Sequence, residues 1–343
     1  MFRIRCSQMT HISPSNPLRH PGHIVLGLFV LLLTPFGPMQ AQDYRLTWSE
    51  EFNEDGKPSS ADWNFEHGFV RNHEYQWYQE DNALAADGFL TIEGRHERIE
   101  NPHYAAPGNA PSEEPEGNAH RRRNNDWRTS RKFAEYTSAS INTRGKHEWL
   151  YGRFEIRAKI PTQSGAWPAI WTLGIRRPWP VNGEIDIMEY YRRNGKPHIL
   201  ANAAWAPQPN QPIWHTEAVP FTHFTDKDSL WAENFHVWRM DWDEDSLHIY
   251  LDDELLNAQS CDVNDGADFH PFRQPHYLLL NLAIGGDNGG EPIPSEYPIQ
   301  YIIDYVRVYQ TPAQQAAQQT LLLSEPSQRD KRTGSRSHAG RHQ

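Results

Sequence analysis

Apolar and polar residues alternate in short runs along the chain from Asp43 to Gln310. Alternation over about four to eight residues is typical of a strand that buries one face. The runs are rich in β-branched and aromatic residues, turn-forming clusters separate them, and no long stripe with helical spacing appears. The pattern therefore predicts an all-β domain of two packed antiparallel sheets. We expect a short helix within Ser229 to Asn234, and strands at Tyr44 to Trp48, Phe89 to Gly94, Tyr136 to Thr143, Tyr151 to Ile160, Ala169 to Leu173, Glu184 to Tyr190, Phe235 to Trp242, Leu247 to Leu251, Tyr277 to Ala283 and Tyr301 to Tyr309.

The beginning of the chain follows a different pattern. Three arginines precede an apolar run from Ile24 to Leu33, and a small residue, Ala41, follows. A basic region, a short apolar region and a small-residue exit are typical of a signal peptide. The apolar run, at about ten residues, is shorter than the ~20 that a membrane span requires. We therefore expect a signal peptide at residues 1–41, no membrane span, and a secreted or periplasmic protein.

Two further segments lack a strand pattern. The stretch from Asn101 to Arg131 is rich in Pro, Asn, Gly and charge, which predicts a long surface loop. A basic patch for nucleic acid is the alternative there, because three arginines follow one another at residues 121–123. After Thr311 the chain has too little apolar content to pack. We expect one domain at residues 42–311 and a disordered tail at residues 312–343.

The net charge of −11 understates how acidic the domain is, because the segment before Asp43 and the tail after Thr311 are both basic. An acidic surface repels nucleic acid and anionic membranes, so we expect neither as a partner. The same field disfavours a polyanionic substrate and favours a neutral polymer. Of the two cysteines, Cys6 lies in the predicted signal peptide, which leaves Cys261 without a disulfide partner in the domain.

The stretch from Glu184 to Glu189 places three carboxylates inside a run that otherwise has the character of a buried strand. Side chains alternate between the two faces of a regular strand, so Glu184 and Asp186 share a face that Glu189 would not. A bulge with one extra residue around Ile187 and Met188 would return Glu189 to that face. The three acids would then line one wall of a groove.

Two carboxyl groups on one wall suit glycoside hydrolysis, in which one attacks the sugar and the other protonates the leaving oxygen. A third acid between them would raise the pKa of its neighbours or share a proton, so that one glutamate stays protonated while the other is ionised. Solvated acids on an exposed strand and a metal site are the alternatives. The intervening Ile185, Ile187 and Met188 favour a central strand above a core, and hence an acidic cleft.

Tryptophans flank this row of acids. Trp167 and Trp171 precede it, and Trp179 comes just before Gly183. Aromatic rings stack on the apolar CH faces of sugars, although a tryptophan in a sandwich is more often part of the core. The chain has thirteen tryptophans, more than one core readily uses, so we expect some of them to line the groove.

Two motifs carry a resemblance to a known family. They are Gly-x-Trp-Pro-Ala-x-Trp from Gly165 to Trp171 and Trp-Pro-x-x-Gly-Glu-Ile-Asp-Ile-Met-Glu from Trp179 to Glu189. Together they resemble glycoside hydrolase family 16, in particular its laminarinase-like β-glucanase branch. The resemblance spans nearly the whole domain, and it includes the segments Trp48 to Asn53, Asn72 to Tyr78, Tyr136 to Ala139, Leu280 to Gly286 and Asp304 to Tyr309.

The resemblance implies a jelly-roll sandwich with a concave substrate cleft and a retaining double displacement that requires no cofactor. Glu184 matches the nucleophile, Glu189 the general acid/base and Asp186 the assisting carboxylate. The positions that it suggests for substrate binding are Trp167, Trp171, Asn281, Trp205, Asn72 and Glu74.

Many relatives also hold a structural calcium ion, and Glu51, Gly88 and Asp304 fall at the matching positions. Oxygen ligands from carbonyls and a carboxylate suit calcium. An ordinary solvated surface is the alternative at these positions.

The chain departs from the laminarinase pattern at two cleft positions. Ala204-Trp205 stands in place of a His-Tyr pair, and Asp287 to Gly290 lacks a tryptophan that usually follows the Gly-Gly segment. The linkage cut therefore stays open. We expect a monomeric, secreted, endo-acting retaining enzyme that cleaves a polysaccharide, β-1,3- or mixed β-1,3/1,4-glucan. An agarase-like or carrageenase-like galactanase, a transglycosylase and a non-catalytic glucan-binding module are the alternatives.

Overall fold

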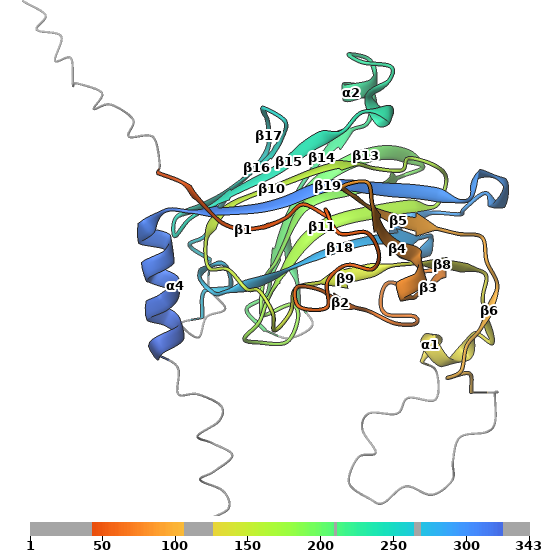
Figure 1. The fold of residues 1–343 in the computed structure, drawn as a ribbon, viewed down its shortest axis with the longest axis horizontal. Coiled ribbons are helices and arrows are strands. Elements are labelled where there is room, and N and C mark those ends of the chain that lie inside the picture. Colours follow the sequence, from red (N-terminus) through yellow and green to blue (C-terminus); the bar gives the residue numbers. More distant parts are fainter. Residues whose placement is uncertain (1–42, 106–125, 209–210, 264–268, 325–343) are drawn as a thin grey trace, which may run out of the picture. The chain divides into compact units, whose positions relative to one another are not determined.

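The computed structural model describes residues 43–105, 126–208, 211–263 and 269–324. The predicted signal peptide lies outside the described residues. Within them, the chain forms two large antiparallel sheets, which confirms the predicted all-β sandwich of the jelly-roll type (Figure 1). In these described ranges no helix is long and apolar enough to cross a membrane.

The first sheet has eight strands in the described part of the chain. Their order is β17-β16-β15-β10-β19-β5-β4, and β1 also pairs with β19. In β10, Phe154, Ile156 and Ala158 are fully buried while the residues between them reach the other face, as the alternation predicts. The strands are β1 Arg45–Glu50, β4 Ala83–Ala86, β5 Phe89–Gly94, β10 Gly152–Lys159, β15 His236–Trp242, β16 Ser246–Leu251, β17 Glu254–Ser260 and β19 Ile299–Gln310.

The second sheet has seven strands among the described residues, in the order β14-β13-β12-β11-β18-β9-β2. The strand that carries the acidic row, β12, lies between β11 and β13, so it is an inner strand as the sequence predicts. The strands are β2 Asn64–Phe65, β9 Ser140–Asn142, β11 Ala166–Gly174, β12 Glu184–Arg193, β13 Lys196–Trp205, β14 Ile213–Pro220 and β18 His276–Ile284.

One apolar core joins the two sheets. Phe154 and Trp238 of the first sheet and Ile185 and Leu280 of the second belong to it, and all four are fully buried. A buried side chain of this kind contributes roughly 1.5–3 kcal/mol to stability. Cys261 is part of the same core, and burial raises the pKa of its thiol to about 12, which leaves it protonated and unreactive at neutral pH.

Shorter elements connect the sheets. Two small sheets pair β3 Gln76–Tyr78 with β8 Tyr136–Ser138 in parallel and β6 Ile99–Glu100 with β7 Phe133–Ala134. The helices of the described residues are α1 Trp127–Ser130, α2 Thr222–Thr225, α3 Gly286–Gly289 and α4 Pro312–Ser324, with 3-10 turns η1 Glu80–Asn82, η2 Trp231–Glu233, η3 Pro271–Arg273 and η4 Pro294–Glu296.

Each strand predicted from alternation overlaps an observed strand, and η2 lies where the short helix was expected. The predicted strand from Tyr136 to Thr143 contains two strands, β8 and β9, which belong to different sheets. The strands that the sequence pattern did not predict are β2, β3, β4, β6, β7, β13, β14 and β17. The helix α1 lies inside the predicted surface loop, of which residues 106–125 are outside the described ranges.

The prediction of disorder from residue 312 onward is wrong for Pro312–Ser324, which form α4. This helix is held to the domain by amide side chains and by Ala317 and Leu321, which pack against the core. Gln314 Nε2 donates to the carbonyl of Trp242 at 3.2 Å, and Gln318 Nε2 donates to that of Glu148 at 3.1 Å. A search for apolar periodicity cannot detect such contacts. Residues 325–343 lie outside the described part of the chain.

Candidate active site

A bulge in β12 brings the three acids to one face of the second sheet. Asp186 pairs with Asn202 on β13 and Glu189 pairs with Leu200, so β12 carries one extra residue over this interval. The same shift in register occurs against β11. Ile187 and Met188 are fully buried in the core, and all three acids line one cleft. The bulge predicted around these two residues is therefore confirmed.

The cleft has a volume of about 720 Å³ and opens on the face of the second sheet that points away from the core. Residues that pair across neighbouring strands point to the same face, so its floor consists of transverse rows. The first row is Leu173, Glu184, Ala204 and Trp214, and the second is Trp171, Asp186, Asn202 and Thr216.

Glu184 is partly exposed at one end of the acidic row. The indole Nε1 of Trp179 donates a hydrogen bond to its Oε2. Burial raises the pKa of Glu184, whereas the Trp179 hydrogen bond and the positive charge of Arg71 act in the opposite direction. These two groups favour the ionised form that a nucleophile requires.

Glu189, at the other end of the row, has a donor on each carboxyl oxygen. Trp167 Nε1 lies 2.8 Å from Oε1, and Asn202 Nδ2 lies 2.7 Å from Oε2. The pKa of Glu189 is raised to about 7, chiefly by burial; the Trp167 hydrogen bond lowers it, the charge of Glu184 raises it, and the Asn202 hydrogen bond lowers it. The carboxyl therefore holds its proton up to neutral pH, as a general acid must.

Asp186 lies between the two glutamates and is 2% exposed. Asn202 Nδ2 donates to its Oδ2 at 3.0 Å, so one amide group serves both Asp186 and Glu189. Burial raises the pKa of Asp186 well above its ordinary value, and the charges of Glu184 and Glu189 add to this effect. The three carboxyl groups therefore do not all ionise together, which is the behaviour that the sequence predicts for a middle acid.

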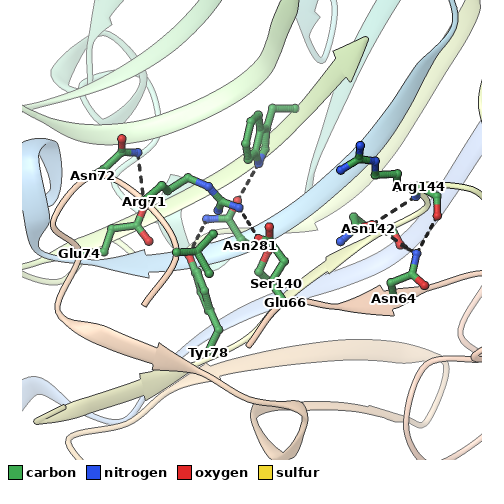
Figure 2. Close-up of polar contacts among 12 residues, drawn as sticks. Asn64, Glu66, Arg71, Asn72, Glu74, Tyr78, Ser140, Asn142, Arg144 and Asn281 are labelled. Atoms are coloured by element: carbon green, nitrogen blue, oxygen red, sulfur yellow. Dashed lines mark hydrogen bonds and ion pairs between the residues drawn. The ribbon is translucent and has the colours of Figure 1, made fainter. Parts of the chain in front are cut away.

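A chain of hydrogen bonds fixes the side of the cleft formed by β11 and β18. Trp171 Nε1 donates to Asn281 Oδ1 at 2.7 Å, and Asn281 Nδ2 lies 3.1 Å from the hydroxyl oxygen of Tyr78. Figure 2 shows Asn281 and Tyr78 joined in this way beside Arg71. Because both Trp171 and Asn281 are buried to more than nine-tenths, the chain holds the indole in one orientation.

Arg71 and Glu74 extend the lining of the cleft on this side beyond the strands of the sheet. Arg71 forms an ion pair with Glu66, and its guanidinium carbon lies 5.1 Å from the ring centroid of Trp171. Glu74 is 2% exposed and accepts hydrogen bonds from Asn72 and from Gln76, the latter at 2.6 Å. Burial raises the pKa of Glu74 to about 7, although the charge of Arg71 lowers it. Figure 2 shows Asn72, Arg71 and Glu74 gathered on one segment.

The cleft brings together most of the residues that the sequence suggested for substrate binding. Trp167, Trp171, Asn281, Asn72 and Glu74 all line it. Their contacts with a sugar stay a prediction.

The suggestion of Trp205 is wrong. It packs against the core, and its ring centroid lies 5.9 Å from that of Phe272. The reason is the alternation in β13: Ala204 and Asn202 face the cleft, so Trp205 faces the other way. Applied to this strand, the same rule would have selected Asn202, which the sequence interpretation missed.

The interpretation also missed Trp214 and Thr216 of β14, together with Arg71 and Tyr191, all of which line the cleft. Trp214 and Thr216 follow the alternation of an unpredicted strand. For Arg71 no sequence signal was available, because its place in the cleft depends on long-range packing.

Two of the three predicted calcium ligands, Glu51 and Asp304, bind arginine side chains. Glu51 accepts hydrogen bonds from Arg307 at 2.9 and 2.8 Å, and Asp304 forms an ion pair with Arg157. A guanidinium group on each carboxylate competes with a cation in this arrangement, and calcium binding at Glu51, Gly88 and Asp304 stays a prediction. Across the described ranges no group of three or more His, Cys, Asp or Glu residues gathers where it could hold a metal ion.

The fold and the cleft together define a class of protein. An antiparallel sandwich carries, on one wall of a cleft, a carboxyl group protonated up to neutral pH and a second one on which a hydrogen-bond donor and a cation act against the effect of burial. These are the two groups that glycoside hydrolysis requires. The chain belongs to glycosyl hydrolases family 16, whose family model matches residues 113–307. It resembles the laminarinase-like β-glucanases within that family, as the motifs predicted.

Three relatives illustrate the match. A β-glucanase of Rhodothermus marinus is 33% identical over 272 residues, which cover 74% of this chain and 79% of the relative. The laminarinase catalytic domain of Thermotoga maritima is 31% identical, with a TM-score of 0.61 over 78% of this chain and 99% of that one. A structure from work on endo-acting O-glycanases, which gut microbiota express to initiate mucin breakdown, is 30% identical, with a TM-score of 0.67 over 80% and 93% of the two chains.

Proposed function

We propose that this chain is a secreted or periplasmic endo-acting glycoside hydrolase that cleaves β-1,3- or mixed β-1,3/1,4-glucan with retention of anomeric configuration. The observation that carries the proposal is the bulged acidic row, in which the surroundings of Glu184 and Glu189 differ. Glu184 has a hydrogen-bond donor and a nearby cation that favour its ionised form, whereas Glu189 keeps a proton up to about pH 7.

The reaction runs in two steps. A carboxylate oxygen of Glu184 forms a bond to the anomeric carbon while the glycosidic C–O bond breaks, and Glu189 gives its proton to the departing oxygen. In the second step water attacks the anomeric carbon, Glu189 takes a proton from that water, and the bond to Glu184 breaks. The protein ends each cycle in its starting protonation state.

Asp186 and Asn202 support both steps through their positions. Asn202 donates to both Asp186 and Glu189, so it fixes the distance between the middle acid and the proton donor. Because the pKa of Asp186 is raised well above its ordinary value, this group can carry a proton beside Glu184 while Glu184 reacts. Such a proton would limit the repulsion between neighbouring carboxylates.

A neutral β-glucan is the substrate that the chain's similarities favour. The R. marinus relative is a β-glucanase, and the T. maritima structure is a laminarinase. A net charge of −11 also opposes binding of a polyanion. The signal-peptide pattern of residues 1–41 supports export, which would give the enzyme access to polysaccharide outside the cell.

The test combines a panel of polysaccharides with two matched variants. Purified protein is incubated with laminarin, lichenan, barley glucan, agarose and carrageenan, and products are sized by chromatography. We expect oligosaccharides of mixed length from the glucans, with the β-anomer formed first in proton NMR spectra. Glu184→Gln should remove measurable hydrolysis, and Glu189→Gln should lower kcat by about 10²- to 10⁴-fold. An unchanged rate in Glu184→Gln, or initial formation of the α-anomer, would refute the proposal.

A galactose-containing glycan is the second candidate. One observation favours it: of the three relatives compared with this chain, the O-glycanase structure has the highest TM-score, 0.67. Agarose, which is in the panel, and mucin glycans added to it decide between the candidates. Cleavage of these substrates without cleavage of laminarin or lichenan would replace the glucan assignment and leave the catalytic roles of Glu184 and Glu189 in place.

Two remaining alternatives give different products. A transglycosylase would form longer oligosaccharides from a single laminari-oligosaccharide, because an acceptor sugar replaces water in the second step. A non-catalytic binding module would bind glucan without releasing reducing ends. The presence of both glutamates in one cleft argues against the module, since function is inferred from the site rather than from the fold.

A further inference from the structure

Two tryptophans of this chain are exposed, and both line the same cleft. All thirteen tryptophans lie within the described residues, and eleven of them are buried or partly buried. Trp179 and Trp214 are 48% and 45% exposed, respectively, and both belong to the wall around the acidic row. A large aromatic surface left open to water in a cleft is typical of a ligand-binding groove.

The strand register places Trp214 beside Glu184. Trp214 pairs with Ala204, and Ala204 pairs with Glu184, so all three side chains point to the same face. Neighbouring strands are about 4.8 Å apart, which puts the backbone of Trp214 about 10 Å from that of Glu184. Ala204 between them contributes only a methyl group and is fully covered. The surface that a ligand meets along this row is therefore set by the larger side chains at its two ends.

Trp179 approaches the same end of the acidic row from the segment before β12. Its indole N–H is used by Glu184, so the orientation of the ring depends on the nucleophile, yet nearly half of the side chain stays exposed. Trp214 touches none of the three acids in the hydrogen bonds of the described residues. It can be changed without removing a contact of the catalytic groups.

The chemistry of this row suits an uncharged sugar. The paired residues Leu173, Glu184, Ala204 and Trp214 include no lysine or arginine, and Glu184 disfavours an anion. An indole face binds the apolar CH surface of a pyranose ring, and this contact does not require a charged group on the sugar. We propose that Trp214, together with Trp179, forms a sugar subsite beside Glu184 that stacks on one uncharged pyranose ring of the polysaccharide. This inference rests on the proposed function, because it deepens the substrate contacts of the same cleft.

Binding to an inactive full-length variant tests the subsite without turnover. Glu184→Gln protein, with and without Trp214→Ala, is titrated with laminari-oligosaccharides of increasing length and with matched galactan oligosaccharides by calorimetry. We expect Trp214→Ala to weaken binding of the longer members by about five- to tenfold, as loss of an aromatic contact does. Sugars too short to reach the subsite should bind equally to both proteins, and Trp214→Phe should retain most of the affinity.

Ile213→Ala is the matched control. Ile213 is the neighbouring residue on β14, is 44% exposed, and does not line the cleft. The Glu184→Gln protein that also carries Ile213→Ala should bind every oligosaccharide with the affinity of Glu184→Gln alone. Equal affinity of Trp214→Ala and the parent at every length would overturn the subsite, as would an equal loss in Ile213→Ala.

The two proposals fail in different ways. If unmodified protein cleaves none of the polysaccharides, the proposed function fails, whereas the titrations still report whether Trp214 binds sugar. If glucan is cleaved and Trp214→Ala has an unchanged KM for the polymer, the subsite fails and the function stands. A raised KM for the polymer in Trp214→Ala supports both.

Discussion

At the scale of single residues, the alkaline limit of the activity depends on one carboxyl group. Glu189 must be protonated to act as an acid, and burial raises its pKa to about 7. We therefore expect kcat/KM to fall as pH rises through about 7, with a slope that reports the loss of one proton. The pH dependence of kcat/KM is the right measurement, because it reports groups of the free enzyme.

Trp167→Phe provides the control for this assignment. The indole hydrogen bond stabilises the ionised form of Glu189 and so lowers its pKa. Phenylalanine cannot donate that bond, so the pKa should rise and the alkaline limb should move to higher pH. The position of the limb is the readout, whatever the change in kcat. A limb that stays in place, or that moves to lower pH, would contradict the assignment of Glu189 as the titrating group.

The residues that could be predicted from the sequence are those whose chemistry is local. Three acids within one strand, separated by buried apolar residues, predicted both the bulge and the shared face of Glu184, Asp186 and Glu189. Trp205 was assigned to the cleft because it is aromatic and near the motif, but strand alternation turns it toward Phe272. Once β13 is known, the same rule selects Asn202. Arg71 could not have been found, because its contact with Trp171 joins segments far apart in the chain.

At the scale of elements, most strands rich in β-branched and aromatic residues were predicted, but β14, which contains Ile213, Trp214, Thr216 and Val219, was missed. β13 contains Leu200 to Ala204, a run of small and apolar residues that is buried on both faces and so shows no alternation. β17 has no β-branched residue. Pairing with neighbouring strands sets the positions of these two strands: β13 lies between β12 and β14, and β17 pairs with β16. The strands that hold Asn202 and Trp214 therefore came only from the structure.

The segment that carries Glu74 should make stability depend on pH. The pKa of Glu74 is about 7 in the folded protein against 4.5 ordinarily, so the folded state holds this proton more tightly. The contribution of Glu74 to the free energy of unfolding is fully present below about pH 4.5 and is lost as pH rises through about 7. Glu74→Gln cannot ionise. We expect its free energy of unfolding to fall less over this interval than that of the parent, by about 2–3 kcal/mol in urea titrations.

Glu233→Gln controls for the removal of one negative charge from an acidic protein, since Glu233 is exposed in η2. This variant should follow the parent at every pH. The prediction fails if the free energy of unfolding of Glu74→Gln depends on pH in the same way as that of the parent. In that case the pKa of Glu74 is not raised in the folded protein.

At the scale of the whole molecule, the catalytic face and the stabilising contacts of the C-terminal helix are separate. The residues that line the cleft come from the second sheet and the segments next to it, and none belongs to α4. In Figure 1, α4 lies at one end of the strands, away from α1. Changes in α4 should therefore alter the stability of the domain and leave its chemistry unchanged.

Truncation after Thr311 tests this separation. It removes four hydrogen bonds between α4 side chains and the domain before Thr311: Gln314 to the carbonyl of Trp242, Gln318 to that of Glu148, and the bonds that Gln318 accepts from the backbone N–H of Leu150 and from the side chain of Gln310. At about 0.5–1.5 kcal/mol each, their loss should lower the free energy of unfolding by about 2–6 kcal/mol in urea titrations. The kcat/KM of the folded fraction should match that of the full chain.

Truncation after Ser324 is the matched control, because it keeps every residue of α4 and removes only residues 325–343. It should leave the free energy of unfolding unchanged. Equal stability of the two truncated proteins would mean that α4 contributes nothing to the domain. A loss of stability confined to the shorter protein would instead show that α4 stabilises the domain, through Gln314 and Gln318, whose amides each satisfy a backbone group, and through the packing of Ala317 and Leu321.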